Sequence, residues 1–221
     1  MATYSEIAQM IDHSLLKPQL DSKTIADGCN IALEYEVASV CVRPCDVQLA
    51  YEIINRSSVK VSTVIGFPHG STTTATKLFE TNEALENGAV ELDMVLNISK
   101  LKSGEYKYVG DEIRSVVEAA HSSDAIVKVI FENCYLSDPE KIEVCKICND
   151  TGVDYAKTST GYGSGGATDE DIKLMRQYCA DSIKIKAAGG IRTLERALQV
   201  RELGCSRIGA TATVDILSRL K

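Results

Sequence analysis

Residues 154–161 read Asp-Tyr-Ala-Lys-Thr-Ser-Thr-Gly, a short strand pattern that runs directly into a glycine-rich loop from Tyr162 to Gly166. Lys157 falls near the end of this strand, which we expect to be buried. Burial disfavours the ammonium form and pushes the side chain toward the neutral amine, which can attack a carbonyl carbon and form a Schiff base. Considered alone, Lys157 has an ordinary alternative, a strand-end lysine whose ammonium extends to solvent. The rest of the sequence decides between the two interpretations.

Apolar strand-like runs alternate with helical patterns along nearly the whole chain, which predicts parallel strands covered by helices. The predicted strands cover residues 11–13, 38–43, 60–66, 90–97, 126–132, 153–159, 182–188 and 207–210. The predicted helices cover residues 4–10, 22–35, 46–57, 74–87, 108–121, 138–151, 169–179, 193–203 and 214–220. We therefore predict an α/β fold, a single (β/α)8 TIM barrel formed by residues 1–221. An open doubly wound sheet is the alternative, but its Gly-x-Gly-x-x-Gly loop is missing near the N-terminus.

The composition excludes several classes of function. Of the 221 residues, 44% are hydrophobic and 25% are charged, as in an ordinary globular protein. No apolar run approaches the roughly 18 residues of a membrane span, and the first residues lack a signal-peptide pattern. A net charge of -7 argues against nucleic-acid binding. We expect a cytosolic protein with neither membrane nor nucleic acid as a partner.

The cysteines and histidines do not predict a metal site. Without a secretory signal, the eight cysteines are expected to be reduced and mostly to pack in the core. Cys145 and Cys148 have a C-x-x-C spacing within a helical pattern, where packing is the leading interpretation and redox or metal roles are the alternatives. The three histidines are scattered along the sequence. We expect no metal and no cofactor.

Strand alternation predicts which side chains point into the barrel. In Ser-Ile-Lys-Ile-Lys, residues 182–186, the isoleucines share one face and the lysines share the other. The apolar face should meet the helices, so Lys184 and Lys186 should point inward. The same alternation places Asp93 and Lys128 on inward faces, and aligns Lys157 with Tyr155 and Ser159. A charged barrel interior is costly for stability, so function is the better explanation for it.

These groups can together activate Lys157. An ordinary lysine has a pKa of about 10.4, and a nucleophile needs that value lowered by roughly three units. A second ammonium about 5 Å away supplies most of this shift, and partial desolvation supplies the rest. Lys186 is the natural second cation. A carboxylate close to Lys157 would oppose the shift, so we expect Asp93 to lie nearer to Lys186 and to transfer protons through water.

Two loops at the end of the chain are candidates for binding phosphate. Gly189-Gly190-Ile191-Arg192 follows the strand of Lys186, and Gly209-Ala210-Thr211-Ala212-Thr213 completes the last predicted strand and continues beyond it. In (β/α)8 barrels these positions often bind phosphate through free backbone N–H groups. Gly161 can bring a third loop close. Tight turns without a ligand are the alternative for such glycines.

The motifs resemble those of the deoxyribose-phosphate aldolase family, and they follow its order over nearly the whole chain. The matching segments are IDHSLLKP at 11–18, SVCVRP at 39–44, VIGFPHG at 64–70, ELDMVLN at 91–97, KVIFENCYL at 128–136, KTSTGYGSGGAT at 157–168, KAAGGIRT at 186–193 and RIGAT at 207–211. Tyr162 is a departure, because some members carry a lysine there that would add a cation for phosphate.

The resemblance implies a cofactor-free class I aldolase with a (β/α)8 fold. The implied reaction is the reversible cleavage of 2-deoxy-D-ribose 5-phosphate to D-glyceraldehyde 3-phosphate and acetaldehyde. Lys157 matches the Schiff-base lysine, and Lys186 with Asp93 matches the proton donor and acceptor pair. The residues implied or predicted to bind substrate are Asp12, Cys41, Lys128, Gly161, Gly189, Gly190, Arg192, Gly209 and Thr211. Barrels of this kind commonly form homodimers or homotetramers, so we expect one of these.

Two other functions fit parts of the pattern. A sugar-phosphate isomerase would use Lys157 to polarise a carbonyl during enolisation, without a covalent bond. A catalytically silent barrel would bind the sugar phosphate without cleaving it. Borohydride inactivation in the presence of substrate separates the covalent aldolase from the isomerase, and acetaldehyde release separates it from the binding protein.

Overall fold

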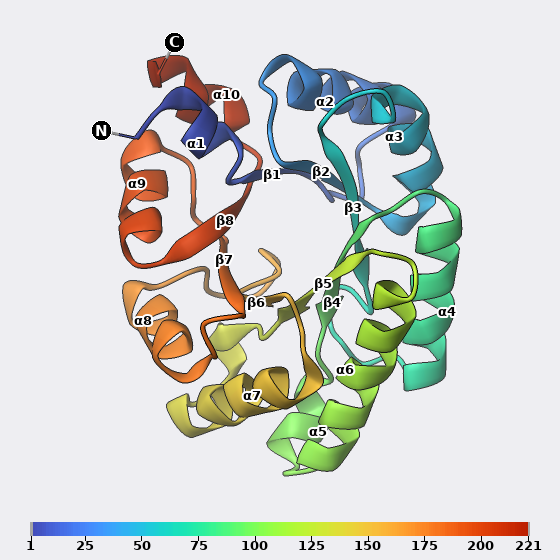
Figure 1. The fold of residues 1–221 in the computed structure, drawn as a ribbon, viewed down its shortest axis with the longest axis vertical. Helices are drawn as coiled ribbons and strands as arrows, with labels where there is room; N and C mark the ends of the chain where they lie inside the picture. The colour runs from blue at the N-terminus through green and yellow to red at the C-terminus, as the bar shows by residue number, and fades with distance from the viewer. Residues whose placement is uncertain (1, 221) are drawn as a thin grey trace.

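Eight parallel strands close into a barrel, each paired with its neighbours in chain order, in the computed structural model, which describes residues 2–220. The helices surround this ring of strands (Figure 1). β8 pairs with β1, and this pairing closes the sheet. The predicted fold class is therefore confirmed. The strands are β1 (Ile11–Leu15), β2 (Ser39–Val42), β3 (Lys60–Ile65), β4 (Glu91–Val95), β5 (Ile126–Ile130), β6 (Tyr155–Lys157), β7 (Lys184–Ala188) and β8 (Cys205–Ala210).

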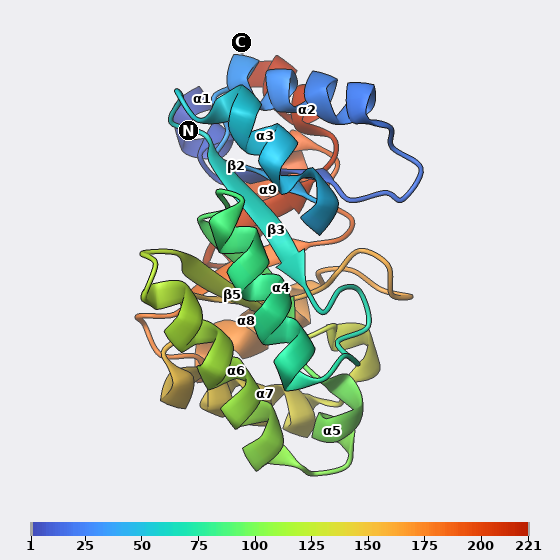
Figure 2. The same ribbon diagram turned by 90° about the vertical axis from the view of Figure 1, so that its right-hand side faces the viewer.

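The helices lie around the outside of the barrel (Figure 2). They are α1 (Tyr4–Ala8), α2 (Ser22–Glu34), α3 (Val47–Ile54), α4 (Thr74–Glu86), α5 (Ile98–Lys102), α6 (Tyr106–His121), α7 (Asp138–Thr151), α8 (Asp169–Tyr178), α9 (Leu194–Glu202) and α10 (Thr213–Leu217). Short 3-10 helices cover Pro44–Asp46, Asn133–Tyr135 and Ser218–Leu220. The two ends of the chain lie together, since α1 contacts α10 (Figure 1).

Local sequence explains where several elements begin and end. Asp21 caps α2 by accepting a hydrogen bond from the backbone N–H of Thr24 at 2.8 Å. Gly152 ends α7 in the left-handed conformation, with a φ of 71°, as expected of a glycine at a helix stop. α5 is not among the predicted helices. Asn97 begins it, because its side chain accepts a hydrogen bond from the N–H of Lys100 at 3.2 Å.

The apolar core lies between the strands and the helices. Leu92 and Met94 of β4 belong to this core and are fully buried, while Asp93, which is also buried, lies between them on the opposite face of the strand. Ile185 and Ala187 alternate in the same way around Lys186. Fully burying one such aliphatic side chain stabilises the fold by roughly 1.5–3 kcal/mol. The outer shell of the barrel therefore carries the stability, which leaves the inside free to hold charge.

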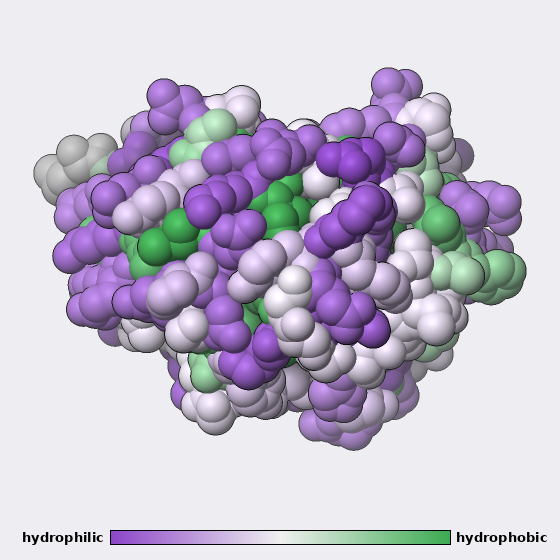
Figure 3. All heavy atoms as spheres, turned by 90° about the horizontal axis from the view of Figure 1, so that it is seen from below, coloured by the Kyte–Doolittle hydropathy of each residue, from purple (hydrophilic) through white to green (hydrophobic). Residues whose placement is uncertain are grey.

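The surface of the molecule is mainly polar. On the face shown in Figure 3, hydrophilic side chains predominate and hydrophobic ones form small separate patches. No helix within residues 2–220 combines the length and the apolar character needed to cross a membrane.

One ion pair lies in the core outside the barrel. The ammonium of Lys77 on α4 contacts the carboxylate of Glu112 on α6 at 2.7 Å, and both side chains are fully buried. The same ammonium donates a hydrogen bond to the carbonyl oxygen of Val95, at the end of β4. Burial lowers the pKa of Lys77 although Glu112 opposes the shift, and burial raises the pKa of Glu112 although Lys77 opposes it. The pair ties two helices to the strand that carries Asp93.

Removing one partner of this pair should destabilise the protein strongly. Lys77→Met leaves a buried carboxylate unpaired, and we expect the free energy of unfolding to fall by roughly 3 kcal/mol, measured by urea denaturation at pH 7. The double variant Lys77→Met/Glu112→Leu should recover most of the loss, because no buried charge remains. Lys107→Met, in an exposed pair with Asp111, is the control and should cost about 1 kcal/mol or less. Equal losses in Lys77→Met and the double variant would contradict this account.

Candidate active site

A cavity of about 280 Å³ opens at the carboxyl ends of the strands, where (β/α)8 barrels place their active sites. The residues that line it come from the ends of β1, β2, β6, β7 and β8 and from the loops that follow some of them. They are Asp12, Ser14, Leu16, Lys17, Cys41, Lys157, Thr160, Gly161, Tyr162, Lys186, Ala188, Gly189, Gly190, Ile191, Arg192, Gly209, Ala210 and Thr211. Most of the predicted site residues are among them.

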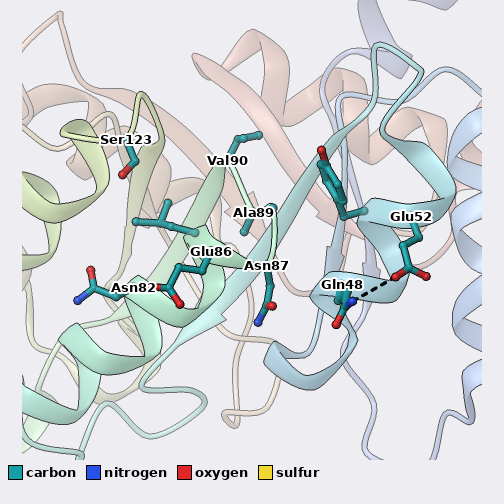
Figure 4. Close-up of a pocket in the computed structure, with 11 residues that line it drawn as sticks. Gln48, Glu52, Asn82, Glu86, Asn87, Ala89, Val90 and Ser123 are labelled. Atoms are coloured by element: carbon teal, nitrogen blue, oxygen red, sulfur yellow. Dashed lines mark hydrogen bonds between the residues drawn. The ribbon is translucent and has the colours of Figure 1, made fainter.

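A larger hollow of about 830 Å³ lies on the outside of the barrel, between α3 and α4. Figure 4 shows Gln48 and Glu52 on α3 across from Asn82 and Glu86 on α4. None of the described residues that line it is a lysine, an arginine or a histidine. This hollow therefore lacks both the cation that an anionic substrate needs and an amine nucleophile, and the smaller barrel cavity is the candidate site.

Strand register brings the two predicted lysines together. Lys157 of β6 pairs in register with Lys186 of β7, so that both side chains point into the barrel side by side. Lys157 is 3% exposed and Lys186 is 1% exposed, although both line the cavity. The alternative in which the ammonium of Lys157 extends to solvent is thus wrong.

Asp93 lies between the two lysines, and here the prediction is wrong. Its Oδ2 atom is 2.6 Å from the Nζ atom of Lys157 and 2.7 Å from that of Lys186. The carboxylate therefore does not favour Lys186 by distance. Because both ammonium nitrogens contact one oxygen, they can be no farther apart than the sum of these distances. A shared acceptor is what allows two cationic groups to be buried so close together.

The pKa of Lys157 is nevertheless lowered, in the predicted direction. The largest cause is burial, which disfavours the charged form. The negative charge of Asp93 opposes the shift, and the positive charge of Lys186 adds to it. The order of causes differs from the prediction, in which the second ammonium was expected to contribute more than desolvation.

Lys186 has the opposite charge preference. Burial alone would lower its pKa, but the carboxylates of Asp12 and Asp93 outweigh burial and raise the pKa. Asp12 contacts Lys186 directly. Burial would raise the pKa of Asp93, yet three lysines, at positions 128, 157 and 186, hold it well below its usual range. The site thus holds one lysine whose pKa is lowered beside one whose pKa is raised.

Two predicted substrate-binding residues are more deeply placed than expected. Lys128 is fully buried and is not among the cavity-lining residues, and its ammonium contacts Asp93 at 2.9 Å and Glu91 at 2.7 Å. Lys128 therefore contacts Asp93 from the side nearer the amino-terminal ends of the strands. Cys41 lines the cavity but is 2% exposed, and burial raises the pKa of its thiol.

The glycine loops after β6 and β7 touch each other. A Cβ atom added to Gly166 would lie 2.4 Å from the carbonyl oxygen of Gly189, so this approach requires glycine. The backbone N–H of Ala167 donates to the same oxygen at 3.1 Å. Together with Gly190, Arg192 and Gly209, these loops form one wall of the cavity. Lys17, an exposed lysine on the loop after β1, also lines the cavity and is not among the predicted site residues.

The loop after β6 is held in place by a buried carboxylate. Glu132 accepts hydrogen bonds from the backbone N–H of Thr160, at 3.2 Å, and from its hydroxyl group. The hydroxyl oxygen of Thr160 in turn accepts from the N–H of Tyr162 at 3.0 Å. The phenol of Tyr162 reaches across the cavity mouth to the carbonyl oxygen of Leu16, at 2.8 Å. Only the tertiary structure brings Glu132 to Thr160.

The remaining cysteines and acidic groups do not form an evident metal centre. Within residues 2–220, no cluster of three or more histidine, cysteine or carboxylate side chains is placed to hold a metal ion. Cys145 and Cys148 are buried on α7 and belong to the hydrophobic core, which agrees with the packing interpretation.

Comparison of sequences shows what this chain is similar to. A family model described as DeoC/LacD family aldolase matches residues 6–216. The deoxyribose-phosphate aldolase of Caldanaerobacter subterraneus subsp. tengcongensis is 54% identical over 216 residues, covering 97% of this chain and 94% of that protein. The deoxyribose-phosphate aldolase of Rhodopirellula baltica is 48% identical over 218 residues, covering 99% and 90% of the two chains.

Solved structures of similar proteins superpose closely. A putative deoxyribose-phosphate aldolase from Coccidioides immitis matches with a TM-score of 0.94 at 39% identity, covering 99% of this chain and 87% of that one. The deoxyribose phosphate aldolase from Aeropyrum pernix, which has a tetrameric structure, matches with a TM-score of 0.91 at 28% identity. That match covers 98% of this chain and 91% of the other.

Replacing Lys186 by methionine should make Lys157 hold its proton more tightly, because the carboxylates would lose one of the cations that they bind. We expect the pH at which cyanate carbamylates Lys157 at half its maximal rate to rise by about one unit or more. Peptide mass spectrometry measures this rate, with the exposed Lys173 as an internal reference. Lys184→Met removes an exposed lysine from the same strand and should leave the profile close to that of the unmodified chain. An unchanged profile in Lys186→Met would contradict a role for Lys186 in setting the charge of Lys157.

Proposed function

Because the chain belongs to the DeoC/LacD family of aldolases, we propose that it reversibly cleaves 2-deoxy-D-ribose 5-phosphate to D-glyceraldehyde 3-phosphate and acetaldehyde. In this proposal it is a class I aldolase, a carbon–carbon lyase that acts through a Schiff base on Lys157. One observation carries the mechanism: a lysine with a lowered pKa lies beside a lysine with a raised pKa, and both line one cavity.

The proposed reaction begins at the open-chain aldehyde. The neutral amine of Lys157 attacks C1, and loss of water leaves an iminium group. The iminium withdraws electrons from the bond between C2 and C3. As this bond breaks, the C3 hydroxyl loses its proton to a base, and C3 becomes the aldehyde carbon of glyceraldehyde 3-phosphate. The enamine left on Lys157 gains a proton at C2, and hydrolysis of the new iminium releases acetaldehyde and the free amine.

Asp93 and Lys186 are the proposed proton acceptor and donor. Asp93 lies within hydrogen-bond distance of both lysines, so it can pass a proton between them directly or through a water molecule. Once Lys157 is bound to substrate, its nitrogen no longer competes as an ammonium for Asp93. Asp12 and Asp93 raise the pKa of Lys186 and so keep it protonated, which makes a proton available there for the enamine. The same pair can work in both directions of the reaction.

The phosphate group is proposed to bind the glycine loops after β6, β7 and β8. Gly161, Gly189, Gly190, Gly209 and Thr211 offer backbone groups along one side of the cavity. Arg192 supplies a fixed positive charge, and Lys17 supplies a second one from the opposite loop. Lys17 compensates for the tyrosine at position 162, where some family members carry a lysine.

The assembly and the location of the protein are part of the proposal. A homodimer or homotetramer is supported by the tetrameric structure of the Aeropyrum pernix relative. The cytosolic location and the independence of metals, cofactors, nucleic acids and membranes stay predictions from the sequence.

Borohydride trapping tests the Schiff base. In the presence of 2-deoxyribose 5-phosphate, sodium borohydride should inactivate the enzyme and leave a reduced adduct on Lys157, identified by peptide mass spectrometry. Lys157→Arg should lower kcat by roughly 10³-fold or more, measured by coupled assay of glyceraldehyde 3-phosphate release, because a guanidinium cannot form the covalent intermediate. Cleavage without borohydride inactivation, or an adduct on another lysine, would overturn the assignment.

Replacing Arg192 tests the phosphate site. Arg192→Met should raise KM for 2-deoxyribose 5-phosphate by roughly 10- to 100-fold with little change in kcat, because a charge-assisted contact to the phosphate is lost. With unphosphorylated 2-deoxyribose, the same variant should have about the same kcat/KM as the unmodified enzyme. Arg201→Met, which removes a surface arginine paired with Glu6, is the matched control. A similar loss on both substrates would show that Arg192 does not act through phosphate.

A further inference from the structure

The barrel interior holds charged side chains that the proposed reaction does not use. Glu91 of β4 and Arg207 of β8 lie on inward faces below the active site, toward the amino-terminal ends of the strands. Their side chains are 5% and 12% exposed. Burying such groups is costly unless each is paired, so their presence inside the barrel calls for an explanation.

These two residues are joined to the active site by unbroken contacts. The guanidinium of Arg207 contacts Glu91 at 2.8 Å and also contacts Asp12. The ammonium of Lys128 contacts Glu91 at 2.7 Å and Asp93 at 2.9 Å. Asp12 and Asp93 then contact Lys186. Each link alternates between a cation and a carboxylate, and the network ends at Lys157.

The two aspartates divide their oxygen atoms between the two ends of this network. Asp93 presents Oδ1 to Lys128 and Oδ2 to Lys157 and Lys186. Asp12 presents Oδ1 to Arg207 and Oδ2 to Lys186. One oxygen of each carboxylate therefore contacts a cation outside the cavity lining, and the other contacts the amines that line the cavity; Oδ2 of Asp12 also lies 3.8 Å from the ammonium of Lys128.

The balance of charges in this network bears directly on whether Lys157 holds a proton. Without Lys157, three carboxylates (Asp12, Glu91 and Asp93) face three cations (Lys128, Lys186 and Arg207). A proton on Lys157 adds a fourth positive charge to a buried, already balanced group. Unbalanced charge is disfavoured at low dielectric, and Lys157 is the member that can lose its proton into the cavity.

The other titratable groups near the network do not alter this balance. Cys41 on β2 stays a neutral thiol, because burial raises its pKa. Tyr155 on β6 lies beneath the cation of Arg207, whose carbon is 5.9 Å from the centre of the ring. Lys184 on β7 is exposed, with its ammonium 5.6 Å from the same ring. β3 contributes Ser62, which has no charge. Lys17 and Arg192 line the cavity from exposed positions on its loops.

We propose that Glu91 and Arg207 are positioning residues that balance the buried charge so that the amine of Lys157 is left neutral. They act through Asp12, Lys128 and Asp93 and touch no substrate. This inference rests on the proposed Schiff-base function of Lys157. It assigns a role in the reaction to the end of the barrel opposite the active site.

Single and paired substitutions test the charge balance, with the acid limb of the pH profile of kcat/KM as the readout. Arg207→Met removes a cation, so Lys157 should keep its proton to higher pH and the limb should move up by roughly one pH unit. Glu91→Gln removes a carboxylate, so the limb should move down. The double variant Glu91→Gln/Arg207→Met restores the balance and should return the limb close to its original position. Arg207→Lys keeps the charge while changing the shape, and its limb should not move.

The outcomes separate charge from structure. A limb that stays in place in both single variants overturns the proposal, as does a double variant whose limb remains displaced. If a single variant fails to fold, Arg207→Lys and the double variant still decide, because a displaced limb in either of them overturns the proposal. Borohydride trapping is run on each folded protein. An adduct on Lys157 with an unmoved limb refutes the inference alone, whereas an adduct elsewhere in the unmodified enzyme refutes the proposed function.

Discussion

One buried carboxylate oxygen, Oδ2 of Asp93, is shared by two ammonium groups, and the rest of the site depends on this contact. With its lysine contacts at 2.6 and 2.7 Å, it makes the close approach of Lys157 and Lys186 possible. Two buried cations without a common acceptor would repel each other and lose their hydration. The same carboxylate also opposes the loss of a proton from Lys157, so burial and the neighbouring cation must outweigh it.

The barrel supplies the setting that this contact needs. Its apolar contacts lie outside the ring of strands, where residues such as Leu92 and Ile185 meet the helices. The inside can therefore hold charged groups without giving up the hydrophobic core. Parallel strands also align their carboxyl ends, which brings side chains from distant parts of the sequence to one opening. The apolar residues that stabilise the fold and the charged residues of the site thus lie on opposite faces of the same strands.

In the loops after β6 and β7, different residues shape the backbone and anchor it. Glycines allow the backbone after β6 and β7 to come together, as Gly166 and Gly189 do. A buried glutamate, Glu132, fixes the start of the loop after β6 by holding Thr160. The glycine-rich loop after β6 is therefore anchored at its base, and Gly161 of this loop lines the cavity.

The sequence alone determined the fold class, the inward direction of Lys157, Lys186 and Asp93, and the loops that line the cavity. These features follow from local periodicity, because a strand alternates its faces every two residues whatever it pairs with. The family resemblance added the reaction. The tertiary structure decided how far Asp93 lies from each lysine, that Lys128 lies below the cavity, and that Glu91 and Arg207 belong to the same network. These features depend on the register and tilt of the strands in the closed barrel, including strands such as β4 and β8 that are not neighbours, and no pattern within one strand encodes them.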